Sequence, residues 1–125
     1  MKGKKTMISH IERGEIYLAD LDPIIGSEQG GVRPVLILQN DVGNYYSDTT
    51  IVASMTSLFR NKKDIPTHFV VKARGELVHD SIVLLEQIRT ISKSRIIKRM
   101  GKLSAKEMDE LNKYLIISIG IKAFQ

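Results

Sequence analysis

Five short segments rich in β-branched and aromatic residues run through this chain, and they restrict its fold more than any other feature. They read EIYLADL, RPVLILQ, TTIVASM, THFVV and DSIVLLEQIRTIS, and they start at residues 15, 33, 49, 67 and 80. Turn-forming residues separate them, first at Asp22-Pro23 and in the glycine-rich residues 26–31, then in residues 40–48 and 61–66. Short strands alternating with turns predict a small β-barrel.

A helix pattern follows at the C-terminus. Ser104 and Glu107 fit a capping box, in which the two side chains satisfy free backbone amides at a helix start. Four apolar residues then recur at spacings of three and four, so they share one helix face that should pack on the barrel. They are Met108, Leu111, Leu115 and Ile119, and Gly120 lies near the expected helix end. Residues 92–99 are expected to hold a second short helix or a turn. The predicted fold class is therefore mainly β (α+β).

Length and composition indicate one compact domain, because 125 residues with 42% hydrophobic content suffice for a single core. We expect a basic, mobile N-terminal extension at residues 1–12 and the folded domain at residues 13–125. The apolar stretches are far shorter than the roughly 20 residues that a membrane helix needs. The lysines near the N-terminus precede no apolar segment of a secretory signal. The chain has no cysteine, which excludes disulfides and thiolate sites. We expect a cytoplasmic protein with no membrane partner.

The charge of the chain favours an anionic partner. Its formal net charge is +5 and its isoelectric point is about 9.5, and each lysine or arginine that neutralises a phosphate releases counterions. One basic cluster follows the last β-rich segment and is interpreted as a solvent-exposed face, the usual role of such runs. It consists of Lys93, Arg95, Lys98 and Arg99.

Several kinds of active site are not indicated. The histidines, His10, His68 and His79, have no zinc-type spacing. Asp20 and Asp22 could recruit magnesium if both lay on one extended segment, but the Asp-Pro sequence fits a strand exit better. The glycine-rich GSEQGG lacks the lysine and hydroxyl of a phosphate-binding P-loop, and the G-x-S-x-G of serine hydrolases is absent. We therefore expect no metal and no cofactor.

Arg33 and Thr56 are the more informative residues. Pro34 biases Arg33 to extended backbone, which fixes its side chain at the start of a strand, and the glycines before it leave room for a phosphate held in bidentate fashion. Thr56 ends the third β-rich segment and is either structural or placed to hydrogen-bond a phosphate oxygen, if the second and third strands are neighbours. Alternatively, the guanidinium of Arg33 forms an ion pair with a nearby carboxylate, that of Asp20, Asp22 or Glu28.

Three segments of the chain read RGEIYLADLDPIIGSEQGGVRPVLILQND, TIVASMTS and SIVLLEQIRTI. In this order and spacing they resemble the MazF/PemK family of toxins from bacterial toxin-antitoxin pairs, in particular its Gram-positive MazF-like members. The similarity runs from about Arg13 to the end of the chain. It implies an SH3-like β-barrel with a C-terminal helix and short additional helices, a homodimer, and metal-independent cleavage of single-stranded RNA at short sequence motifs. It also implies a cognate antitoxin, expected to be acidic, that neutralises the toxin.

The resemblance assigns roles by position. Arg33 in GGVRPVL matches the catalytic arginine of the family, and Thr56 in IVASMTS matches its catalytic threonine. Glu28 is a candidate for catalytic support. The candidate RNA-binding residues are Ser27, Glu28, Gln29, Glu86 and Gln87. The chain departs from the family pattern in residues 1–6 and around residues 59–63. Because base preference depends on such loops, the cleavage motif does not follow from the resemblance.

The implied reaction is attack of the RNA 2′-hydroxyl on the adjacent phosphate, which gives a 2′,3′-cyclic phosphate and a 5′-hydroxyl end. DNA lacks that hydroxyl and is not expected to be a substrate. Arg33 and Thr56 would stabilise charge on the phosphorane. One alternative is a non-catalytic toxin or binding module of the same fold that acts on a topoisomerase or on RNA, since fold alone does not fix function. Another is a structural subunit, in which both residues would affect only stability.

Overall fold

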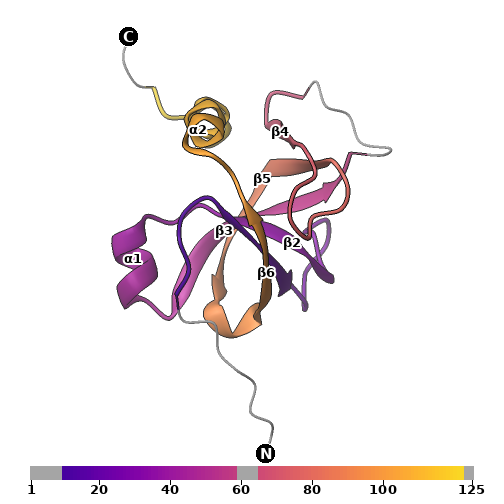
Figure 1. Ribbon diagram of the computed structural model, residues 1–125, viewed down its shortest axis with the longest axis vertical. Coiled ribbons are helices and arrows are strands. Elements are labelled where there is room, and N and C mark those ends of the chain that lie inside the picture. The colour runs from indigo at the N-terminus through magenta and orange to yellow at the C-terminus, as the bar shows by residue number, and fades with distance from the viewer. Residues whose placement is uncertain (1–9, 59–64, 123–125) are drawn as a thin grey trace, which may run out of the picture.

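The computed structural model describes residues 10–58 and 65–122 (Figure 1). Of the N-terminal extension expected at residues 1–12, residues 1–9 lie outside the described residues, while Ile11 is buried in the core. The variable loop at residues 59–63 also lies outside them. The elements are β1 (Glu15–Asp20), β2 (Val32–Ile37), α1 (Asp41–Tyr46), β3 (Thr49–Ser57), β4 (His68–Val71), β5 (Ser81–Ser92), the 3₁₀ turn η1 (Lys93–Arg95), β6 (Ile96–Lys102) and α2 (Ala105–Ile119). All five β-rich segments therefore form strands. The short helix or turn expected in residues 92–99 is η1, and β6 is a further strand that begins in the same region.

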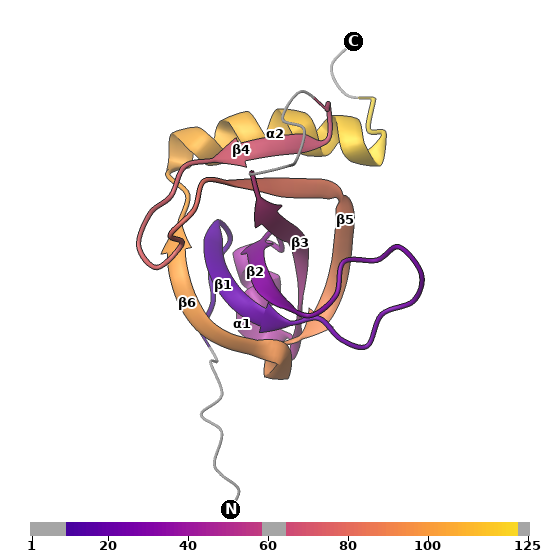
Figure 2. The same ribbon diagram turned by 90° about the vertical axis from the view of Figure 1, so that its right-hand side faces the viewer.

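The strands form one strongly curved antiparallel sheet in the order β4-β5-β3-β2-β1-β6. Figure 2 shows this sheet nearly end-on, with β5 and β6 curving around β1, β2 and β3. The two edge strands do not pair with each other in the described part of the chain. Instead, the turn at residues 74–77 reaches across the opening, where the backbone N–H of Glu76 donates to the carbonyl of Met100 at 2.8 Å. The mainly β fold class with a C-terminal helix is confirmed. The sheet is curled, and this turn links its two edges, whereas in a closed barrel the edge strands would pair with each other.

Both faces of the central strands are buried, so their sequences are almost continuously apolar. Leu36 and Met55 belong to a cluster that α2 covers with Leu111. Val35 and Tyr17 belong to a second cluster. Successive residues of a strand point to opposite faces, so β2 contributes to both clusters in turn.

Helix α2 begins and ends as its sequence predicts. The hydroxyl of Ser104 accepts from the backbone N–H of Glu107, and the carboxylate of Glu107 accepts from the backbone N–H of Ser104. Gly120 ends the helix in the left-handed conformation at φ 73°. Of the four predicted contact residues, Met108 and Leu111 are buried and Leu115 packs against the core. The prediction is wrong for Ile119, which is 54% exposed because the last turn extends past the bend of β5 (Figure 2). No helix within the described residues is long and apolar enough to span a membrane.

The segment between β2 and β3 holds a short helix rather than a simple turn. Asn40 caps α1 by accepting from the backbone of Gly43, and the ammonium of Lys93 donates to the carbonyl of Asn44 near the helix end. Lys93 is only 7% exposed, so its interpretation as part of a solvent-exposed basic face is wrong. The carbonyls at a helix C-terminus attract cations, which accounts for its burial.

An ion pair joins α2 to the turn that links the sheet edges. Because of this pair, we expect the free energy of unfolding to fall in acid. Arg74 donates to both carboxylate oxygens of Glu107 at 2.5 and 2.7 Å, and this bidentate bond lowers the pKa of Glu107 from 4.5 to about 2. The resulting stabilisation is present above about pH 4.5 and is lost as pH falls towards 2. The side chains are 23% and 32% exposed, so after solvent screening we expect about 1–2 kcal/mol.

Urea unfolding of the parent and of Glu107→Gln measures this contribution. Glutamine can still complete a capping box, so the variant should be less stable near neutral pH by that amount. The difference between the two proteins should shrink as pH falls to about 3. An equal difference at both pH values would show that the Arg74 pair is not its source.

Candidate active site

Arg33 is the second residue of β2 and is half-buried. Its Nε donates to the carbonyl of Gly30 at 2.9 Å, and its Nη1 donates to the carbonyl of Met55 at 3.3 Å. Two carbonyls thus hold the guanidinium at the strand start, as the following proline predicts. The guanidinium forms no ion pair with any of the three nearby carboxylates, all within the described residues: Asp20, Asp22 and Glu28. The ion-pair alternative for this arginine is therefore wrong.

Thr56 lies across from Arg33 on the neighbouring strand. Strands β2 and β3 pair antiparallel, with Val35 opposite Ser54, which confirms the strand adjacency that the sequence interpretation required. Continued by two residues, this register places Thr56 opposite Arg33 on the same face of the sheet. The extended register therefore assigns a cation and a hydroxyl to the same face at one end of the curled sheet.

A bend in β5 presents the second group of candidate residues. The pairing of β3 with β5 shifts between Ala53, opposite Ile88, and Ser54, opposite Leu84, which leaves residues 85–87 outside the ladder. Figure 2 shows the ribbon turning a corner there.

Two hydrogen bonds fix this bend. The N–H of Leu85 donates to the carbonyl of Thr67 at 2.8 Å, and the hydroxyl of Ser118 in α2 donates to the carbonyl of Leu85. Glu86 and Gln87 follow directly, so both side chains project from a fixed backbone.

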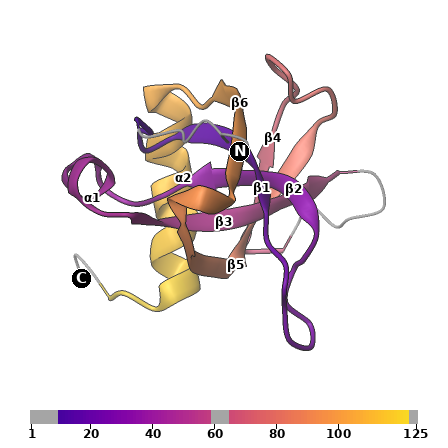
Figure 3. The ribbon, with the colours of Figure 1, turned by 90° about the horizontal axis from the view of Figure 1, so that it is seen from below.

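The loop between β1 and β2, residues 21–31, is held at its base. The N–H of Leu21 donates to the carbonyl of Gly31 at 3.0 Å, and the carboxylate of Asp22 accepts from the N–H of Gly31 at 2.9 Å. Nη1 of Arg89 donates to the carbonyl of Leu21 at 2.9 Å, and Arg95 donates to carbonyls on the same side of the loop, those of Asp20 and Asp22. The loop projects from one side of the sheet (Figure 3), and its stem has a defined geometry.

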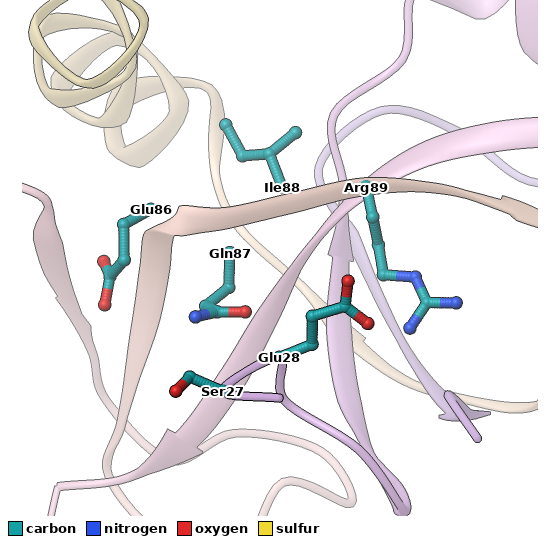
Figure 4. A pocket seen from close by; sticks show the side chains of 6 residues that line it. All are labelled: Ser27, Glu28, Glu86, Gln87, Ile88 and Arg89. Carbon is teal, nitrogen blue, oxygen red and sulfur yellow. The ribbon is translucent and has the colours of Figure 1, made fainter. Parts of the chain in front are cut away.

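The loop and the bend of β5 enclose a hollow of about 450 Å³. Its lining residues are Ser27, Glu28, Glu86, Gln87, Ile88 and Arg89 (Figure 4). The N–H of Gln29 donates to Oε1 of Gln87 at 3.2 Å and ties the two walls together. All five predicted RNA-binding residues are therefore brought together, four in the lining and Gln29 directly behind it. Gly30, next to Gln29, accepts from Arg33, so a hydrogen bond links the loop that lines the hollow to the start of β2.

The two acidic residues of this hollow have different environments. Glu28 is exposed in the loop, where its Oε1 accepts from the N–H of Ile25 at 3.0 Å. Glu86 is held by Thr67 and His68. Partial burial raises the pKa of Glu86, but hydrogen bonds from His68, the backbone and Thr67 outweigh it, so the net shift is downward. Glu86 is therefore a carboxylate near neutral pH.

The arrangement suits a phosphodiester with its flanking bases. A fixed guanidinium and a hydroxyl can bind phosphate oxygens, while carboxylate and amide groups can read base edges. Within residues 10–58 and 65–122, no group of three or more histidine or acidic side chains could hold a metal ion.

The sequence and the fold were compared with those of known proteins. A profile of the PemK-like, MazF-like toxins of type II toxin-antitoxin systems matches residues 12–119. The chain belongs to this family. The endoribonuclease MazF of Staphylococcus saprophyticus is 52% identical over 112 residues, which cover 89% of this chain and 92% of that protein.

Solved structures of MazF proteins share the fold. A MazF crystal structure from Deinococcus radiodurans is 25% identical with a TM-score of 0.72, and the match covers 89% of this chain and 97% of that one. A mycobacterial endoribonuclease in complex with its cognate antitoxin is 22% identical with a TM-score of 0.74, covering 90% and 98%.

Sequence reasoning missed several residues around this hollow. Arg89 was present in the quoted LLEQIRTI segment but received no role. Arg95 was assigned only to an exposed basic face, and its hydrogen bonds to the loop stem were not foreseen. His68 was considered only as a metal ligand, whereas it contacts Glu86. Neither Arg95 nor His68 carries a local sequence signal for these contacts, because their partners are distant in the chain.

Proposed function

We propose that this protein is the endoribonuclease toxin of a type II toxin-antitoxin pair, cleaving single-stranded RNA, including mRNA, in a sequence-specific and metal-independent reaction. The observation that carries the proposal is the β2–β3 register, which when continued sets Arg33 opposite Thr56, two residues after the loop that lines the hollow. The hollow provides a surface for unpaired bases, and the Arg33–Thr56 pair provides a site for the phosphate between them. Family membership and the 52% identical endoribonuclease support the same conclusion.

The reaction needs no external nucleophile. The 2′-oxygen attacks phosphorus and loses its proton to a base, the bond from phosphorus to the 5′-oxygen breaks, and that oxygen takes up a proton from an acid. The products are a 2′,3′-cyclic phosphate and a 5′-hydroxyl. Arg33 and Thr56 donate hydrogen bonds to the non-bridging oxygens, whose negative charge increases in the phosphorane.

Glu28 is the proposed proton acceptor. A guanidinium stays protonated near neutrality and is a poor base, whereas Glu28 lies in the lining of the hollow. Its loop position allows approach to a bound 2′-hydroxyl. A Glu28→Gln variant that cleaves at the parent's rate between about pH 5 and 9 would assign the proton transfer to another group.

The toxin would act in the cytoplasm as a homodimer and be inhibited by an antitoxin. Support for an antitoxin comes from the mycobacterial structure, which holds a cognate antitoxin, and from the net charge of +5. An acidic segment would associate rapidly with such a surface. Covering the hollow would block RNA entry.

The test is incubation of the purified protein with a long single-stranded RNA in excess EDTA, followed by mapping of the ends. Cleavage with cyclic phosphate ends is the expected result, and a DNA of the same sequence should stay intact. Absence of cleavage on varied RNAs would support instead a non-catalytic toxin acting on a topoisomerase or RNA. Binding to each of these would then be measured.

A further inference from the structure

Two residues outside the hollow form hydrogen bonds to the carboxylate of Glu86, one of the acidic residues that line it. The hydroxyl of Thr67 donates to Oε1 of Glu86 at 2.9 Å, and Nε2 of His68 lies 3.1 Å from Oε2 of the same carboxylate. A carboxylate can only accept hydrogen bonds, so Nε2 of His68 carries the proton. Together with the backbone hydrogen bond, three of the roughly four lone-pair sites of Glu86 are occupied, and the carboxylate retains acceptor capacity for a ligand.

The support for Glu86 is more buried than Glu86 itself. The His68 side chain is 9% exposed, while that of Glu86 is 43% exposed. His68 is the first residue of the edge strand β4 and pairs with Leu84 in β5, and the carbonyl of Thr67 accepts from Leu85. A buried imidazole cannot leave its partner without a desolvation cost. Thr67 and His68 thus set the orientation of the Glu86 side chain before any ligand binds.

A fixed carboxylate selects among nucleobases by their donors. An exocyclic amino group, as in cytosine, adenine or guanine, donates to such an acceptor, and a carboxylate accepting from cytosine N4 is an established pairing. Uracil has no amino group, and its one base-edge donor, N3–H, lies between two carbonyl oxygens that a carboxylate repels, so uracil should bind Glu86 less well. A mobile glutamate would discriminate less, because part of the interaction would be lost in ordering its side chain.

We propose that His68 and Thr67 are positioning residues that fix Glu86 as the acceptor for an amino-bearing base in the RNA, which makes Glu86 a specificity determinant. The inference rests on the proposed ribonuclease function. The lowered pKa of Glu86 agrees with it, since only the ionised form lacks a donor.

Cleavage-site mapping on a long single-stranded RNA tests this inference, with His68→Phe, His68→Gln and Glu86→Gln beside the parent. The parent should require an amino-bearing base at one position of its motif. His68→Phe keeps the bulk without the donor and should lose that preference by on the order of tenfold or more, as should Glu86→Gln. His68→Gln places an amide donor where Nε2 stood and should restore most of it. The double variant His68→Phe/Glu86→Gln should match Glu86→Gln alone, because both act through one contact.

The controls separate this role from simple destabilisation. His10→Phe removes an exposed histidine whose Nε2 lies 3.2 Å from Glu12, and it should keep the parent's base preference. If His68→Phe does not fold, Thr67→Val and His68→Gln still test the contact. A His68→Phe variant with the parent's preference, or a double variant with an added loss, overturns the inference while the ribonuclease function stands. A parent that cleaves no RNA overturns both.

Discussion

Replacing Arg33 by alanine should abolish nearly all RNA cleavage while the protein stays folded. Loss of a single donor to a developing oxyanion costs on the order of a hundred- to a thousand-fold in rate, and Arg33 contributes a full charge as well as donors. Single-turnover cleavage of a short RNA containing the mapped site measures the chemical step directly. Arg33→Lys keeps the charge but not the planar fork, so it should fall between alanine and the parent.

A second arginine provides the matched control, because Arg33 also has a structural contact. Its Nε binds the carbonyl of Gly30 at the end of the β1–β2 loop, whereas Arg95 binds carbonyls at the beginning of the same loop. If Arg33 acted only by anchoring the loop, Arg95→Ala would slow cleavage as strongly. We expect Arg95→Ala to have a much smaller effect, and circular dichroism of both variants should match the parent. Equal losses would assign Arg33 a positioning role instead.

The contrast between Arg33 and Arg95 also shows what the sequence could predict. Arg33 was identifiable because a proline fixes its backbone and glycines precede it, both local features. Thr56 was a candidate from its place at the end of a β-rich segment, and the family similarity added its catalytic role. In the same way, the capping box at Ser104 and Glu107 predicted the start of α2. Arg95 lies 73 residues from Asp22, one of its partners, and its neighbours in sequence give no sign of that contact.

The bend of β5 illustrates the same limit. Its segment reads as one continuous β-rich strand, and only the register against β3 reveals that residues 85–87 leave the ladder. The positions of Glu86 and His68 depend on that bend. Similarity to a family could therefore list the residues around the hollow, but the contacts that orient them required the structure.

Replacing Gly75 by alanine should have the largest effect on stability. Gly75 lies in the turn that links the edges of the sheet, at φ +53°, and a Cβ there would stand 2.4 Å from the backbone carbonyl oxygen of Met100. That oxygen accepts from the N–H of Glu76, so relief of the clash would break the bond that joins the turn to β6. Together with the strain of a left-handed alanine, we expect a loss of about 2–4 kcal/mol in the free energy of unfolding, measured in urea.

Gly120→Ala separates the two causes of this loss. Gly120 has a similar φ of +73°, but an added Cβ would meet nothing within 4 Å, so its variant should lose only about 1 kcal/mol. Equal losses in the two variants would mean that the turn yields without cost and that the Glu76–Met100 bond contributes little. The activity of Gly75→Ala is equally informative. Where the variant is still folded it should cleave RNA, because the bonds that hold Arg33 go to Gly30 and Met55 and not to this turn. A folded but inactive Gly75→Ala would instead show that the turn at residues 74–77 takes part in the site through Leu77, which lies beside Thr56 in an apolar hollow.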